Sequence, residues 1–159
     1  MKITVISVGK LKEKFYREAV EEYAKRLSRY CKLELIEVAD EKTPEGASEL
    51  EEEKILEREA DRILGKIRED AFVCALEIKG RKLSSEGLAE WMQCLTVEGT
   101  SHITFVIGGS LGLHSSVRKR ADFALSFSNM TFPHQLMRVI LLEQIYRSFR
   151  IINGEPYHK

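Results

Sequence analysis

The sequence has few of the residues that form disulfide frameworks, metal sites or membrane spans. Its three cysteines (Cys31, Cys74 and Cys94) are far apart and form no C-x-x-C pair. We interpret them as small buried hydrophobic residues in a reducing compartment. The four histidines have no metal-ligand spacing such as H-E-x-x-H, so we expect no metal site. No apolar run is long enough for a membrane span, and the first residues carry no signal-peptide cleavage pattern. We therefore expect a cytoplasmic protein without membrane contact.

The chain also lacks an excess of charge of either sign, because 25 basic residues balance 25 acidic ones. This excludes a general nucleic-acid binder, which is usually a basic domain. The charge is nevertheless uneven, since residues 1–32 and 114–159 are basic and residues 39–61 are acidic. We interpret the acidic stretch as the solvated side of a helix, and a single basic face remains available to RNA.

Apolar periodicity predicts alternating strands and helices along the whole chain. Ser48 and Glu51 have the spacing of a capping box, and Ser84 or Ser85 is a candidate cap for a later helix. The expected strands are residues 2–8, 33–38, 71–78, 102–107 and 123–128, and the expected helices are residues 13–31, 49–67, 84–95, 115–121 and 134–152. This order predicts one α/β domain over residues 1–159, with a mostly parallel sheet and helices on both faces.

The last predicted helix, from His134 to Ile152, carries apolar residues almost all round. A helix of this kind is buried on every side. In a domain of this size its own sheet covers one side, and a second copy of the chain is the natural cover for the other. The sequence therefore predicts a homodimer.

A glycine-rich loop follows the strand that ends at Ile107. Gly108, Gly109 and Gly112 read G-G-x-x-G, which matches neither the dinucleotide fingerprint nor the P-loop, and no lysine follows to contact a phosphate. Ligands of parallel sheets bind beyond the carboxyl ends of the strands, so the loops after Ile78, Ile107 and Ser128 are candidates for a binding site. The alternative is that the glycines only permit a tight turn.

Three segments of the sequence closely resemble the ribosomal RNA large subunit methyltransferase H family. They are the opening "ITVISVGK", the loop "FVIGGSLGL" and the C-terminal stretch "TFPHQLMRV…EQIYR" with its terminal "PYHK". The resemblance covers essentially the full length and is densest from Phe105 to Lys159. It implies a SPOUT-type fold with a C-terminal trefoil knot, a homodimer with an active site built by two chains, and S-adenosylmethionine as the cofactor. The implied reaction is methylation of N3 of a pseudouridine in 23S ribosomal RNA.

The resemblance also assigns the cofactor contacts to the same three loops. By position they fall on Leu76, Gly108, Phe127, Ser128, Asn129, Met130, Thr131 and Phe132. Adenosine would lie against bare backbone there, which agrees with the missing phosphate-binding lysine. Leu76 and Phe132 have plainer interpretations as a core leucine and as a plug for the turn before Pro133.

The methylated nitrogen must lose a proton, which requires a general base or a cation that stabilises the deprotonated ring. His158 and Tyr157 are candidates on the C-terminal tail, which we expect to lie near the transferred methyl group and to add little stability. Arg138 is a third candidate, facing the rRNA or pairing with a carboxylate across the dimer. Arg118, Lys119 and Arg120 form a basic cluster suited to phosphate contacts. With zero net charge, we expect recognition of an assembled ribosome and weak binding of free RNA.

Two other functions remain open from the residues alone. The first is a nucleotide- or flavin-binding module of doubly wound type, which requires a phosphate site that the glycine loop lacks. The second is a non-catalytic dimeric scaffold on the ribosome, which predicts an empty cofactor pocket and a dispensable tail.

Overall fold

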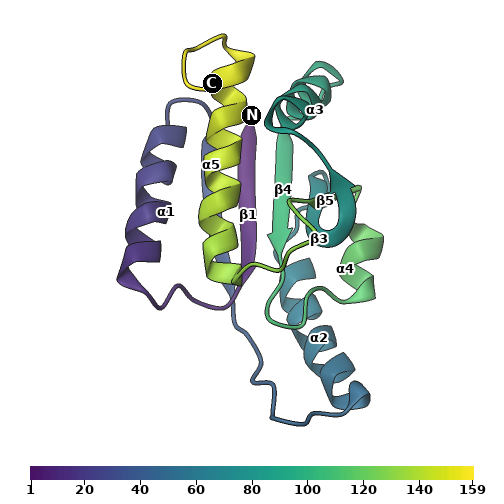
Figure 1. The fold of residues 1–159 in the computed structure, drawn as a ribbon. Coiled ribbons are helices and arrows are strands. Elements are labelled where there is room, and N and C mark those ends of the chain that lie inside the picture. The colour runs from purple at the N-terminus through teal and green to yellow at the C-terminus, as the bar shows by residue number, and fades with distance from the viewer.

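The computed structural model describes residues 1–159 and contains one five-stranded sheet with the strand order β2-β1-β4-β3-β5 (Figure 1). Every neighbouring pair of strands is parallel. The elements are β1 (Lys2–Val8), α1 (Lys14–Leu27), β2 (Lys32–Val38), α2 (Glu49–Leu64), β3 (Phe72–Lys82), α3 (Ser85–Val97), β4 (His102–Ile107), α4 (Ser115–Arg120), β5 (Phe123–Ser126) and α5 (His134–Ile152). None of the helices has the length and apolar character needed to cross a membrane.

Helices cover both faces of the sheet, as the sequence predicts. Alternate strand residues point to opposite faces, so Ile3 and Val5 of β1 pack with α1, α3 and α5, whereas Ile6 and Val8 pack with α2 and α4. β4 lies at the centre of the sheet and is buried along its whole length. This double burial explains why β1 and β4 carry apolar residues on both faces in the sequence.

The predicted element order is confirmed, and the errors are confined to element ends. Helix α1 ends at Leu27 and α2 at Leu64, several residues before the predicted limits. The capping box of Ser48 and Glu51 is present, and Ser84 is the residue that caps α3. Strand β5 is shorter than predicted and ends at Ser126.

The prediction of a turn after Ile78 is wrong, because β3 continues to Lys82. Both Leu76 and Arg81 align with Leu125 of β5, so the four residues between them form an excursion from the ladder. Gly80 allows the excursion to pass close to β5, since a Cβ atom there would lie 2.8 Å from the carbonyl carbon and oxygen of Ala124. Burial also falls along this strand, and Ile78 is 48% exposed.

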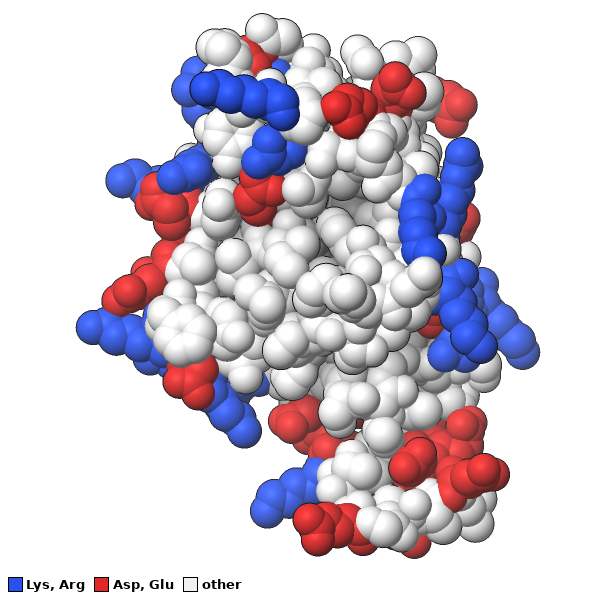
Figure 2. Space-filling model, in the orientation of Figure 1, with Lys and Arg blue, Asp and Glu red and all other residues white.

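Helix α5 lies between α1 and α3 on one face of the sheet (Figure 1). Its inner side chains, including Leu141, Leu142 and Ile145, are fully buried against the sheet and the two neighbouring helices. The other apolar side chains, such as Leu136, Val139 and Ile140, are only half-buried. Figure 2 shows that the middle of this face carries no charged residues and that Lys, Arg, Asp and Glu gather around it. An uncharged centre with a charged rim is the usual arrangement of a protein interface.

Candidate functional site

A pocket of about 190 Å³ lies between the excursion of β3, the loops that follow β4 and β5, and the start of α5. It is open to solvent and smaller than the 300–1,000 Å³ usual for sites that enclose a small molecule. Its lining consists of Leu76, Glu77, Ile78, Ile107, Gly108, Gly109, Ser110, Gly112, Leu125, Phe127, Ser128, Met130, Thr131, Phe132, His134 and Met137.

The structure brings together seven of the eight predicted cofactor residues, since Asn129 alone does not line the pocket. Sequence reasoning missed the contribution of α5, where His134 and Met137 face the pocket from the first turn of the helix. Their spacing of three residues puts both side chains on the same side of a helix. Because the loop before α5 is a candidate for the site, this spacing indicates that both side chains can face it.

The glycine loop folds back on itself directly after β4. Gly112 donates a backbone hydrogen bond to Gly109 (3.1 Å) and adopts a positive φ of 84°. A Cβ atom on Gly108 would lie 2.5 Å from the Gly112 carbonyl oxygen. The plainer interpretation of these glycines is therefore correct in part, because Gly108 and Gly112 are needed by the turn itself. The same turn leaves bare backbone at the pocket wall.

The loop after β5 is fixed by hydrogen bonds from its own serines. The buried Ser126 hydroxyl donates to the carbonyl oxygen of Ser128 (3.1 Å), and the Ser128 hydroxyl accepts from the backbone N–H of Met130 (3.0 Å). These bonds hold an otherwise irregular segment in one conformation. Met130 remains 72% exposed at the edge of the pocket.

No lysine or arginine lines the pocket, and its one carboxylate belongs to Glu77. Glu77 is paired with Arg118 of α4 at 2.6 Å. Burial lowers the pKa of His134, and the nearby positive charge of Arg138 lowers it further. His134 is therefore neutral at pH 7, and the pocket is better suited to a cationic or neutral ligand than to a phosphate.

Arg138, a predicted catalytic residue, is buried with only 5% of its surface exposed. Its guanidinium donates to the carbonyl oxygens of Val8 (3.0 Å) and Gly9 (2.7 Å) and forms an ion pair with Glu37 of β2 at 2.7 Å. The carboxylate partner that we expected across a dimer thus lies in the same chain. The placement of Arg138 argues against a direct contact with RNA, because the residue is buried and the end of β1 and Glu37 occupy its two terminal nitrogens.

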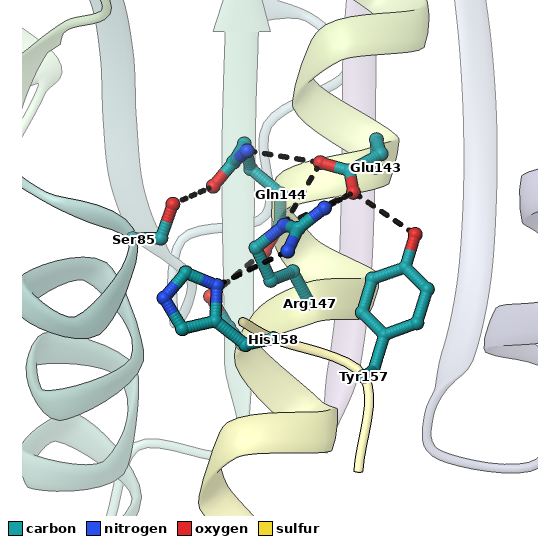
Figure 3. Close-up of polar contacts among 7 residues, drawn as sticks. Ser85, Glu143, Gln144, Arg147, Tyr157 and His158 are labelled. Carbon is teal, nitrogen blue, oxygen red and sulfur yellow. Dashed lines mark hydrogen bonds and ion pairs between the residues drawn. The ribbon is translucent and has the colours of Figure 1, made fainter.

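The C-terminal tail is docked on its own chain, next to α5 and α3 (Figure 3). The Tyr157 hydroxyl donates to Glu143 (3.1 Å), and the Tyr157 ring packs against that of Tyr146 with centroids 5.0 Å apart. These contacts contradict the expectation that the tail adds little to stability. Burial raises the pKa of Tyr157, and the Glu143 carboxylate raises it further. The Tyr157 phenol is therefore protonated near neutral pH.

His158 makes one contact with each ring nitrogen. Arg147 lies 3.1 Å from its Nδ1, and Glu86 lies 2.6 Å from its Nε2. Because arginine has only donors, Nδ1 must accept, which leaves the proton on Nε2 for donation to Glu86. Both contacts together describe the tautomer with its proton on Nε2 and with the Nδ1 lone pair directed at Arg147.

The prediction that the tail lies near the pocket is wrong within one chain. Met137 is the last pocket residue of α5, and Arg147, which contacts His158, is ten residues further along. That separation is about 15 Å along a helix axis at 1.5 Å per residue. In Figure 1 the C-terminus is at the opposite end of α5 from the carboxyl ends of the strands.

Cysteine placement agrees with the expectation of structural thiols for two of the three residues. Cys74 is fully buried in β3 and Cys31 is half-buried, whereas Cys94 is exposed. Burial raises the pKa of Cys31 to about 11, so its thiol is uncharged at neutral pH. No group of three or more histidine, cysteine or acidic side chains has an arrangement that would hold a metal ion.

Comparison with known proteins gives consistent similarities over the full chain. The family model described as "Predicted SPOUT methyltransferase" matches residues 1–158. Two proteins named ribosomal RNA large subunit methyltransferase H, from Bifidobacterium adolescentis and Acetivibrio thermocellus, are 63% and 56% identical over 159 residues, with both chains of each pair fully covered. The solved structure of a probable methylase family protein from Haemophilus influenzae Rd KW20 is similar in fold, with a TM-score of 0.54 and 15% identity. That similarity covers 99% of this chain and 70% of the other.

We predict that Gly108→Ala destabilises the protein by about 1–3 kcal/mol, because the new Cβ overlaps the Gly112 backbone and the loop must open. Urea unfolding followed by circular dichroism measures this change. Gly65→Ala is the matched control, since Gly65 has a helical φ of −64° and its nearest neighbour would be 3.3 Å from the new Cβ. Equal stability of the two variants would show that the loop does not need glycine at position 108.

We predict that Arg138→Met lowers the free energy of unfolding by about 1–3 kcal/mol, because the carbonyls of Val8 and Gly9 lose their donor. Glu37→Gln keeps those two bonds and removes only a half-exposed charge, so its effect should be smaller. The free energy of unfolding of each variant is obtained from the midpoint and slope of urea unfolding. A fully stable Arg138→Met variant would contradict the structural role of this residue.

Proposed function

This chain belongs to the SPOUT methyltransferase family, and on that premise we propose that it methylates large-subunit ribosomal RNA with S-adenosylmethionine as the methyl donor. More specifically, we propose N3 of a pseudouridine in 23S ribosomal RNA as the target, presented on the assembled ribosome in the cytoplasm. Two relatives that carry the name ribosomal RNA large subunit methyltransferase H match the chain from end to end, which supports the RNA substrate.

The observation that carries the proposal is the chemistry of the pocket wall. The excursion of β3 and the loops after β4 and β5 provide backbone, apolar and hydroxyl side chains, a single carboxylate and no lysine or arginine. S-adenosylmethionine supplies an electrophilic methyl group on a positively charged sulfonium, and it has no phosphate. The donor set of the pocket therefore fits this cofactor, and it disfavours the nucleotide- or flavin-binding alternative, which needs cations or a run of free N–H groups for phosphates.

The residues have distinct roles in this proposal. Leu76 and Phe132 provide the apolar walls, and the backbone at Gly108 and along Phe127–Thr131 provides hydrogen-bonding groups for an adenine ring. Methyl transfer is an in-line displacement, so the main contribution of these residues is to orient the two reactants. The fixed loop from Ser126 to Met130 is suited to that purpose.

In this proposal, the tail of one chain acts at the pocket of a second copy of the chain. His158 and Arg147 are about 15 Å of helix away from the pocket of their own chain, whereas a twofold axis that pairs α5 with a second α5 in antiparallel orientation would bring them close to the other pocket. The half-buried apolar side of α5 supports such a homodimer. The open pocket supports it as well, because a partner could complete the enclosure.

The N3 proton of the target base needs an acceptor or a stabilising charge. Of the tail residues, His158 is suited to be the base, because its Nδ1 lone pair becomes free if the target displaces Arg147. Arg147 is suited to stabilise the deprotonated ring in the same movement. Tyr157 is the weaker candidate for a base, because its phenol is held in the protonated form. The trefoil knot implied by the sequence resemblance, with α5 as the threaded segment, remains part of the same proposal.

Calorimetry with S-adenosylmethionine tests the proposal against the alternative of a non-catalytic scaffold. We expect one binding site per chain, and transfer of labelled methyl groups to unmethylated bacterial ribosomes. Met137→Trp should abolish binding, because an indole on the rigid first turn of α5 fills the pocket. Absence of both binding and transfer in the wild-type protein would favour the scaffold.

We predict that activity can be restored by mixing two inactive chains, one truncated after Pro156 and the other carrying Met137→Trp. Each alone lacks either the tail or the pocket. After subunit exchange, a mixed dimer contains one intact pocket next to one intact tail, so about a quarter of the wild-type activity should return. Light scattering verifies that both chains are dimers. Unrestored activity in a mixture that contains mixed dimers would mean that the tail does not act across the interface.

A further inference from the structure

The basic cluster predicted from the sequence is largely engaged in contacts within the fold. Arg118 is paired with Glu77 at 2.6 Å. Arg120 contacts Asp122 at 3.5 Å and donates to the carbonyl oxygens of Arg68, Glu69 and Ala71. Of the three residues only Lys119 is exposed and without a carboxylate partner. The predicted cluster alone is therefore a weak site for phosphates.

A stronger concentration of free positive charge lies on the outer part of β3. Lys79, Arg81 and Lys82 are all exposed, and none of them has a carboxylate within ion-pair distance. The acidic residues next to this segment in the sequence are already paired, Glu77 with Arg118 and Glu86 with His158. In Figure 2, Lys and Arg side chains gather along the side of the molecule formed by β3 and α4.

An irregularity in the pairing of β3 with β5 positions this segment. The excursion between Leu76 and Arg81 turns residues 77–80 away from the ladder, and the chain then pairs again with β5 at Arg81 and Lys82. Gly80 is required at the closest approach to the backbone of Ala124. Irregularities of this kind are common next to active sites, where they redirect side chains. Arg81 and Lys82 are thus carried by a paired strand, and Lys79 by the excursion directly before it.

The same excursion forms one edge of the pocket. Glu77 and Ile78 line it, and Lys79 follows them directly. Ile78 and Met130 are the two strongly exposed apolar side chains among the lining residues. An RNA strand that contacts the cations of β3 would therefore pass these two apolar side chains at the entrance of the pocket.

We propose that Lys79, Arg81 and Lys82, assisted by Lys119, bind phosphates of the RNA strand that carries the target base, and that Ile78 and Met130 contact the base as it enters the pocket. The inference rests on the proposed function and names the surface that recognises its substrate. Phosphate contacts position a nucleic acid without reading its sequence. A localised basic edge gives a protein of zero net charge such contacts without general affinity for RNA.

The test compares two triple variants by their KM for unmethylated bacterial ribosomes at several salt concentrations. One is Lys79→Gln, Arg81→Gln and Lys82→Gln. The matched control is Lys42→Gln, Lys54→Gln and Lys66→Gln, three exposed lysines without carboxylate partners on and around the acidic α2. We expect KM to rise at least about tenfold in the first variant at about 0.1 M salt. The slope of log KM against log salt should fall by about 2–3, because each phosphate contact contributes about 0.7–0.9. The control should stay within about twofold of the wild type.

Calorimetry with S-adenosylmethionine separates this inference from the proposed function. If both triple variants bind the cofactor and have the same KM and the same salt slope, the inference is wrong and the proposed function stands. If the wild-type chain neither binds the cofactor nor transfers methyl groups, both are wrong. A photoreactive benzoylphenylalanine at position 79 identifies the partner, since the inference requires an RNA adduct and a ribosomal-protein adduct alone would overturn it.

Discussion

The buried guanidinium of Arg138 joins the parts of the fold on which the pocket depends. It connects α5 to the last carbonyl groups of β1, and its pairing with Glu37 extends the connection to β2. Glu37 also accepts a hydrogen bond from the backbone of Leu11, so the loop after β1 belongs to the same network. A buried arginine with several backbone acceptors costs desolvation, but it fixes geometry well because its donors lie in one plane. His134, one turn before it, and Met137, directly before it, take their positions at the pocket from this arrangement.

The pocket shows how a parallel sheet can form a ligand site without binding phosphate. Doubly wound folds usually direct a helix N-terminus and a glycine loop at an anion. Here the helix after the glycine loop, α4, begins with His114, whose imidazole caps its own helix and is paired with Glu53 of α2 at 2.6 Å. The N-terminus of α4 is thus occupied by the side chains of His114 and Glu53. The glycine loop folds on itself through Gly109 and Gly112, and presents a wall of backbone in place of a cradle of N–H groups.

Local patterns in the sequence were sufficient to predict most of the fold. The apolar runs of β1 and β4, the capping box at Ser48 and the bounds of α5 follow from periodicity and capping chemistry. The excursion of β3 was missed because it depends on a contact between Gly80 and β5, which is about 44 residues away and leaves no local signature beyond a glycine. The partners of Arg138 and Arg118 were missed for the same reason, since Glu37 and Glu77 have no fixed sequence spacing to them. The loops after β4 and β5 meet in one pocket, as predicted, because the carboxyl ends of parallel strands must lie on one edge.

The length of α5 determines which pocket the C-terminal tail can reach. A straight helix holds the pocket residues at its first turn and the tail contacts near its last, and its burial against the sheet prevents it from bending enough to join them. A tail that acts in catalysis must therefore act on another chain, and the contact of His158 with Glu86 must persist in the proposed dimer to hold the imidazole in position when the target displaces Arg147. The ion pair of Arg147 with Glu143 at 2.6 Å restrains that position from the side of α5. One helix thus carries the proposed interface and sets the distance between the two halves of the proposed site.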